Sequence, residues 1–178
     1  MALAGFLLVN RADSQAPSHA PPVRYQVSIE KNVPSTMRDG TVLRSDIHHP
    51  RAPGRFPALL QRTLYSKNDA RASQQFGELA GHGFVVLIQD TRGRYMSDGE
   101  ARPHDEAQDG FDNIARVARL SYANRKVGMF GGSYLATTQL LAATLKPPDW
   151  LLCTMRTKSL VFAGMPPPGP WTTMVIRS

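Results

Sequence analysis

The chain has 178 residues, of which 42% are hydrophobic and 20% charged, and these proportions exclude disordered, collagen-like and coiled-coil proteins. The formal net charge is +7, but no run of lysines and arginines alternates with aromatic residues, which argues against nucleic-acid binding. No apolar run approaches the roughly 18 residues that a membrane span needs, and the single cysteine, Cys153, allows no disulfide within the chain.

The first 22 residues are predicted to lie outside the folded domain. Residues 1–9 are apolar like the central region of a signal peptide, and Ser18-His19-Ala20 resembles a cleavage site, but the usual positive charge at the start is missing. Residues 10–22 contain Ser, Ala and Pro and are typical of a linker. The segment is either a degraded export signal or a frayed terminus, so both a cytoplasmic and an exported location stay open.

Two antiparallel strands are predicted next, over residues 25–29 and 41–47, on either side of the turn pair Asp39-Gly40. A short apolar strand over 56–60 is followed by a helix over 70–81, which ends near glycine. Residues 84–88 are apolar on both faces, as the centre of a parallel sheet requires. The chain thus changes from antiparallel to parallel pairing.

The second half alternates helices and strands. A helix over 105–120 has acids in its first turn, a strand covers 127–130, a helix over 134–146 stops at Pro147-Pro148, and a strand covers 151–155. This order predicts an α/β fold over 23–155, with antiparallel strands first and then parallel strands with flanking helices. Residues 156–178, rich in proline, are predicted to be irregular, which would leave the sheet incomplete at its C-terminal side.

One strand-to-helix junction carries the chemistry. Gly131-Gly132-Ser133 joins an apolar strand to a helix, the context of a nucleophile elbow, in which small residues before the serine permit a sharp turn. A serine that caps the helix is the alternative interpretation. A phosphate-binding loop is disfavoured because no lysine precedes the serine, and the histidines have no metal-ligand spacing. No cofactor or metal is therefore predicted.

Five motifs in order resemble the cocaine-esterase-like branch of the α/β-hydrolases, which also holds X-Pro dipeptidyl-peptidases and α-amino acid ester hydrolases. They are Met37-Arg38-Asp39-Gly40 with Asp46 and Pro50; Arg62-Thr63-Leu64-Tyr65 with Lys67; Gln89-Asp90-Thr91-Arg92-Gly93-Arg94 with Ser97, Gly99 and Glu100; Glu106-x-x-Asp109-Gly110-x-Asp112; and Val127-Gly-Met-Phe-Gly-Gly-Ser-Tyr134. The resemblance extends over residues 33–150 and implies the N-terminal half of an α/β-hydrolase catalytic domain.

The resemblance implies roles for three residues. Ser133 would be the nucleophile that forms an acyl-enzyme from a small-molecule ester, amide or peptide, and the oxyanion would accept hydrogen bonds from the backbone N–H of Tyr134 and the phenol of Tyr65. Asp90 and Arg92 would form an ion pair that braces their loop. The family's usual Pro and Gly are replaced by Leu64 and Ala136.

The triad acid and base are the open question. The family order is Ser, then Asp or Glu, then His, whereas only Asp149 and no histidine follow Ser133. We therefore expect a truncated serine hydrolase that is weakly active or inactive. Two alternatives remain: a small hydrolase whose base is His104 or belongs to a partner chain, and a non-catalytic binding module that reuses half of the fold. The oligomeric state is not predicted.

Overall fold

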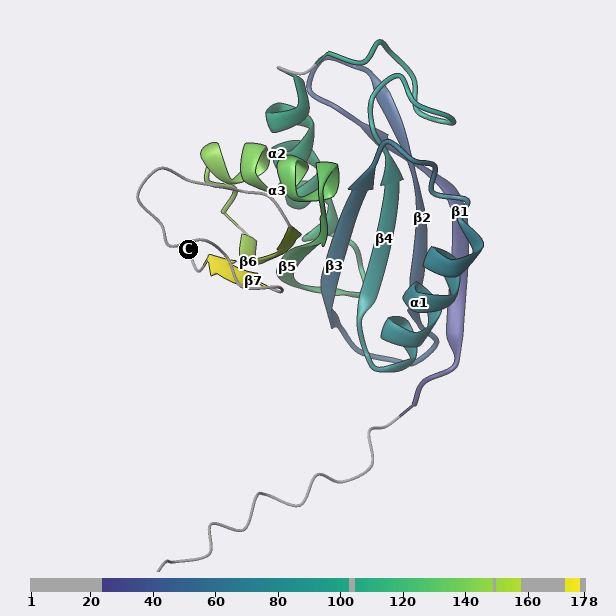
Figure 1. Ribbon diagram of the computed structural model, residues 1–178. Coiled ribbons are helices and arrows are strands. Elements are labelled where there is room, and N and C mark those ends of the chain that lie inside the picture. The colour runs from purple at the N-terminus through teal and green to yellow at the C-terminus, as the bar shows by residue number, and fades with distance from the viewer. Residues whose placement is uncertain (1–23, 103–104, 149, 158–171, 177–178) are drawn as a thin grey trace, which may run out of the picture.

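The computed structural model describes residues 24–102, 105–148, 150–157 and 172–176 (Figure 1). The predicted N-terminal segment 1–22 and His104 lie outside the described residues. The elements, in chain order, are β1 (Val27–Thr36), β2 (Val42–Pro50), β3 (Phe56–Thr63), α1 (Ala70–Gly81), β4 (Val85–Asp90), α2 (Asp105–Val117), β5 (Ala123–Gly132), α3 (Tyr134–Thr144), β6 (Trp150–Thr157) and β7 (Thr172–Ile176). None of the described helices is long and apolar enough to cross a membrane.

The strands form one seven-stranded mixed sheet in the order β1-β2-β4-β3-β5-β6-β7. The β1–β2 and β2–β4 pairs are antiparallel, and the β4–β3, β3–β5 and β5–β6 pairs are parallel. The chain is thus an α/β fold in which antiparallel N-terminal strands precede parallel strands, as the sequence predicts.

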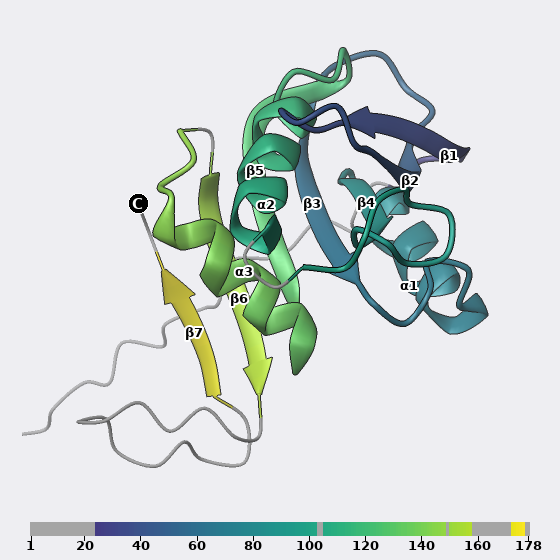
Figure 2. The ribbon, with the colours of Figure 1, turned by 90° about the horizontal axis from the view of Figure 1, so that it is seen from above.

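Helices cover both faces of the sheet, and β4 shows why. Val85 and Leu87 belong to the core beneath α2 and α3, whereas Val86 and Ile88 pack with Phe76 of α1 on the other face. Alternate side chains of a strand point to opposite faces, so a strand buried on both sides needs a continuous apolar run. Figure 2 shows α1 and α2 on opposite sides of β3.

The last described strand differs from the sequence prediction. Thr172–Ile176, within the segment predicted to be irregular, forms β7 and pairs antiparallel with β6 from Cys153↔Ile176 to Thr157↔Thr172. This part of the predicted irregular segment is therefore ordered as a strand. It adds an edge strand instead, because its Thr, Val and Ile residues favour extended backbone and β6 offers unpaired N–H and C=O groups.

Candidate functional site

The candidate site lies where three neighbouring parallel strands end. β4, β3 and β5 are adjacent, and β3 pairs with β5 with Leu60 opposite Met129. Tyr65 comes two residues after the end of β3, and Ser133 comes directly after β5. The register therefore places both at the carboxyl edge of the sheet, where ligands bind in open α/β sheets.

Ser133 has a backbone conformation that serine rarely adopts. Its φ is 57° and its ψ is −126°, outside the helical and strand regions. The residue is exposed, and its side chain makes no capping hydrogen bond to α3. Its carbonyl oxygen accepts hydrogen bonds from the N–H groups of Ala136 (2.9 Å) and Thr137 (3.2 Å). The backbone thus begins the helix while the hydroxyl has no capping role.

Gly131 makes this turn possible. Its φ is 134°, and a Cβ placed there would lie 2.6 Å from the Cβ of Leu135 in the first turn of α3. Only glycine accommodates both the positive φ and the close approach. The turn that presents Ser133 therefore depends on the absence of a side chain two residues earlier.

Tyr134 begins α3 with its backbone, and its side chain reaches Glu106. As the first residue of α3, it has an N–H group without an intrahelical acceptor. Its hydroxyl donates a hydrogen bond to Oε2 of Glu106 at 3.4 Å. Burial, with the negative charge of Glu106, raises the pKa of Tyr134, which keeps the phenol protonated.

Tyr65 lies in the loop after β3 with 57% of its surface exposed. Its backbone N–H donates to Oγ1 of Thr63 at 3.0 Å, which closes a short turn at the strand end. Ser66 follows with a φ of 80°. The exposed phenol is thus carried by a tightly turned segment.

Asp90 fastens this segment to the loop that follows β4. Its Oδ1 accepts a hydrogen bond from the N–H of Lys67 (2.8 Å), and its Oδ2 accepts one from the N–H of Met96 (3.3 Å). Its own carbonyl oxygen accepts a hydrogen bond from the hydroxyl of Ser97 at 2.7 Å. Burial raises the pKa of Asp90, and the two N–H groups and the Lys67 charge only partly oppose this effect.

Lys67 is itself buried beside two carboxylates. Its Nζ lies 3.3 Å from Oδ1 of Asp46 and 4.0 Å from Oδ2 of Asp90. Asp46 also accepts hydrogen bonds from Nζ of Lys31 (2.7 Å) and from the N–H of Asn32 (2.9 Å). Burial acts to raise the pKa of Asp46, but these hydrogen bonds and the two lysines lower it overall.

The predicted Asp90–Arg92 ion pair is wrong. Arg92 instead holds Asp109 with two hydrogen bonds of 2.6 and 3.0 Å and also donates to Asp39 at 2.6 Å. The Asp39 partnership lowers the pKa of that carboxyl, chiefly through the hydrogen bond from Arg92. Side chains that are close in sequence on a loop need not face each other. Here Asp90 binds the backbone of Lys67 and Met96, whereas Arg92 binds Asp109 and Asp39.

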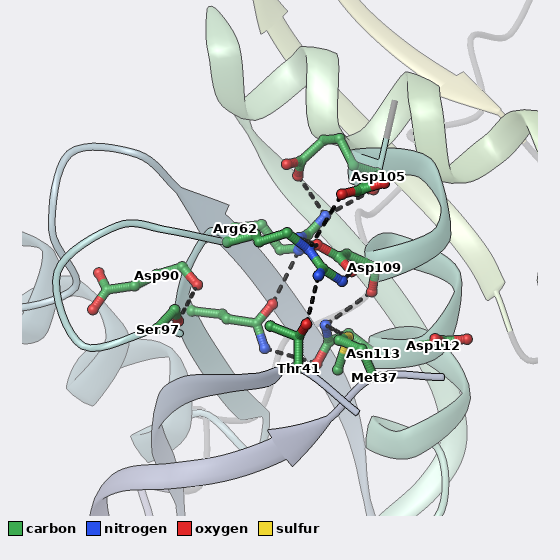
Figure 3. A network of polar contacts seen from close by, with 12 residues as sticks. Met37, Thr41, Arg62, Asp90, Ser97, Asp105, Asp109, Asp112 and Asn113 are labelled. Atoms are coloured by element: carbon green, nitrogen blue, oxygen red, sulfur yellow. Dashed lines mark hydrogen bonds and ion pairs between the residues drawn. The ribbon is translucent and has the colours of Figure 1, made fainter. Parts of the chain in front are cut away.

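A buried polar network is centred on Arg62 (Figure 3). Arg62 is fully buried, donates to Oε1 of Gln89 at 3.0 Å, and forms an ion pair with Glu106. Gln89 in turn donates to Oδ1 of Asn113 at 2.7 Å. The network therefore links β3 and β4 to α2.

The sequence alone did not indicate a role for Arg62, Gln89, Glu106 or Asp109. Their signal was present, because Arg62 and Gln89 each follow an apolar strand run and all four stand in the quoted motifs. A buried charged residue needs a charged or hydrogen-bonding partner, but the sequence did not identify the pairs. These four motif residues are thus structural partners of one another in the fold.

The described histidines lie away from Ser133. His48 and His49 are on β2, and His48 is paired with Val86, near the beginning of β4. His82 caps the C-terminus of α1, just before β4 begins. His48 packs edge-on against Phe76 at 6.1 Å, and His49 stacks on Tyr122 at 4.3 Å. In the part of the chain that the structure describes, no cluster of His, Cys, Asp and Glu could hold a metal ion.

Comparison with known proteins supports the predicted resemblance. A family model described as X-Pro dipeptidyl-peptidase (S15 family) matches residues 39–156. The cocaine esterase of Rhodococcus sp. (strain MB1 Bresler) is 41% identical over 121 residues, which cover 65% of this chain and 21% of that enzyme.

Solved structures agree with this match. A CocE/NonD family hydrolase from Staphylococcus aureus has a TM-score of 0.65 and 29% identity, over 70% of this chain and 26% of that one. An α-amino acid ester hydrolase, with a TM-score of 0.63, 24% identity and coverage of 83% of this chain and 28% of its own, shares the fold. The chain spans about a fifth to a quarter of the length of these relatives. Sequence motifs, sheet order and comparisons together show that the chain belongs to the X-Pro dipeptidyl-peptidase (S15) family of α/β-hydrolases.

Proposed function

We propose that this chain supplies the nucleophile and oxyanion-binding groups for hydrolysis of a small-molecule ester, amide or peptide, with Ser133 as the nucleophile. The observation that supports this most is the backbone of Ser133, with φ 57° and ψ −126° and an exposed, uncapped hydroxyl. Strained backbone conformations cluster at functional sites, and the side chain of Ser133 makes no capping hydrogen bond, so a functional role is favoured.

The chemistry would proceed by acyl transfer. Ser133 Oγ attacks the substrate carbonyl carbon and loses its proton to a general base, while the carbonyl oxygen becomes an oxyanion. Collapse of this intermediate expels the protonated alcohol or amine and leaves an acyl-enzyme, which water then hydrolyses. The Tyr134 N–H and the Tyr65 phenol would stabilise the oxyanion, an effect worth about 2.7–4 kcal/mol for each donor lost.

The general base must come from outside the described residues. His48, His49 and His82 lie on β2 or before β4, away from the carboxyl edge of the sheet. His104, or a histidine of another polypeptide segment, would have to fill this role. Without such a base a serine hydroxyl is a poor nucleophile, and only the oxyanion groups and binding contribute to the rate. If His104 is not the base, we therefore expect slow turnover by this chain without the segment that supplies one.

Covalent labelling by a fluorophosphonate probe, followed by peptide mapping, tests the assignment. Ser133 is expected to be the labelled residue, Ser133→Ala to prevent labelling, and the exposed Ser121→Ala to preserve it. Tyr65→Phe should slow hydrolysis of p-nitrophenyl butyrate by about 10²–10³-fold. Labelling at a different residue, or undiminished hydrolysis by Ser133→Ala, would contradict the proposal.

The source of the base is tested separately. If His104 is the base, His104→Ala should abolish labelling and added imidazole should restore it. If another segment supplies the base, His104→Ala should leave labelling unchanged, and imidazole should accelerate labelling of the unsubstituted chain. A non-catalytic module would show neither labelling of Ser133 nor a response to imidazole.

A further inference from the structure

A cavity of about 290 Å³ is lined in part by Tyr134, which directly follows the proposed nucleophile, and has no assigned role. Its volume is at the lower end of the range for small-molecule pockets, about 300–1,000 Å³. The residues considered below line it: Leu64, Arg94, Arg102, Glu106, Tyr134 and Leu141.

Two residues that line the cavity are direct sequence neighbours of the proposed site residues. Leu64 directly precedes Tyr65, and Tyr134 directly follows Ser133. Thr137 also lines it, and its backbone N–H bonds to the carbonyl oxygen of Ser133 at 3.2 Å. The cavity is therefore within one helical turn of the serine, where a substituent of a substrate bound at Ser133 would extend.

Of the four charged residues that line the cavity, only Arg94 lacks an ion-pair partner among the described residues. Arg92 is already held by Asp109 and Asp39, and Glu106 is held by Arg62. Arg94 is exposed and forms no ion pair within the part of the chain that the structure describes, and its charge acts on the Tyr134 phenol.

Arg102 forms one ion pair, and that pair is exposed to solvent. Its partner is Glu100 at 3.1 Å, and the two side chains are 57% and 81% exposed. Exposed pairs of this kind contribute little and exchange readily with solvent ions. Arg94 and the weakly paired Arg102 thus both line the cavity, while Leu64, Leu141 and Ala101 provide apolar surface.

We infer that this cavity binds a carboxylate of the substrate, with Arg94 as the main specificity residue and Arg102 in support. The substrate class is then an ester or amide that carries a carboxylate joined to the scissile carbonyl by a short carbon chain. Arginine suits this task because its planar guanidinium can donate two parallel hydrogen bonds to a carboxylate. The inference rests on the proposed function for its place in a reaction, but binding can be measured without any reaction.

The test compares two ligands that differ in one charge. Monomethyl glutarate and dimethyl glutarate share a carbon skeleton, and only the first has a free carboxylate. Titration calorimetry with the full chain carrying Ser133→Ala, which removes the nucleophile, is expected to show about tenfold tighter binding of the monoester. Arg94→Gln should abolish this preference, and added salt should weaken it.

Arg71→Gln is the matched control, since Arg71 is an exposed arginine on α1 and its loss should leave the preference unchanged. Equal or undetectable binding of the two esters overturns the inference, as does a preference that survives Arg94→Gln in a variant with an unchanged circular dichroism spectrum. Failure of the proposed function is distinguishable, because it appears as absent labelling of Ser133 in a protein that still prefers the monoester.

Discussion

The carboxylate of Asp90, the last residue of β4, accepts a hydrogen bond from the backbone N–H of Lys67 at 2.8 Å. Lys67 stands two residues after Tyr65, so the end of one strand holds the loop that follows its neighbour. The other carboxylate oxygen of Asp90 accepts a hydrogen bond from the backbone N–H of Met96. Met96 lies in the same loop as Arg94, which lines the cavity. A single buried carboxylate therefore couples the position of the proposed oxyanion tyrosine to that of the cavity.

Asp90→Asn should loosen both loops. The amide retains only one oxygen, so one backbone N–H loses its acceptor, and Lys67 loses one of its two carboxylate neighbours. Leaving buried polar groups unsatisfied costs about 1–3 kcal/mol of unfolding free energy. Urea unfolding measures this loss, and hydrogen exchange at the Lys67 and Met96 amides should accelerate. The exposed Asp98→Asn on the same loop is the control and should change neither quantity.

Arg62→Met should be among the most destabilising substitutions in the chain. Arg62 is fully buried, and its loss leaves Glu106 without its ion-pair partner and Gln89 without a donor. Breaking a buried pair by removing one partner costs about 3–5 kcal/mol. Thermal and urea unfolding provide the measurement, with the exposed Arg55→Met just before β3 as control. A loss no larger than that of the control would show that the network contributes little to stability.

Ser133→Gly is expected to raise the stability of the fold while abolishing labelling. Residues held in sparsely populated backbone regions cost about 1–3 kcal/mol, a cost that glycine avoids, although glycine loses about 0.5–1 kcal/mol more entropy on folding. The unfolding free energy should therefore increase by about 1 kcal/mol. Ser121→Gly offers a comparison outside the elbow and should be neutral or destabilising. A destabilised Ser133→Gly protein would mean that the serine is not strained.

The buried His48 should make stability fall in mild acid. Burial and the charge of Lys31 lower its pKa from 6.5, with Asp46 opposing them, so the unfolded chain binds the proton more readily than the folded one. The stability that neutral His48 contributes is thus present above pH 6.5 and is lost as the pH falls below it. The unfolding free energy of the unsubstituted chain relative to His48→Leu should decrease between pH 7 and pH 5. His82→Gln, at an exposed cap, is the control. A pH-independent difference would exclude this contribution.

Local patterns were sufficient for the central elements. The helix predicted over 70–81 has the bounds of α1, and the apolar run at 84–88 lies within or directly before β4. Both depend on interactions within a few residues: Asp69 caps α1 by accepting from the N–H of Ala72, and apolar periodicity fixes which faces are buried. Helix ends were less accurate, since α2 ends at Val117 rather than at residue 120.

Long-range pairing could not be obtained in this way. Arg92 forms hydrogen bonds with Asp109 and Asp39, which are 17 and 53 residues away in sequence, and not with Asp90, two residues before it. Likewise, Thr172–Ile176 forms a strand because it pairs with the edge of β6. The five residues of this segment do not by themselves reveal that such an edge is nearby. These outcomes depend on which groups the folded chain brings within a few ångströms.

By itself the sequence determined the α/β class, the order of the central elements and the glycine-serine turn, because backbone conformation and apolar period are local properties of the chain. Only the tertiary structure decided that Tyr65 and Ser133 follow adjacent strands, that Asp90 holds the Tyr65 loop, and that Arg94 lines the cavity without an ion-pair partner among the described residues. Strand order and burial set these relationships, since they bring together groups far apart in the sequence and remove from water the charges that must then be paired.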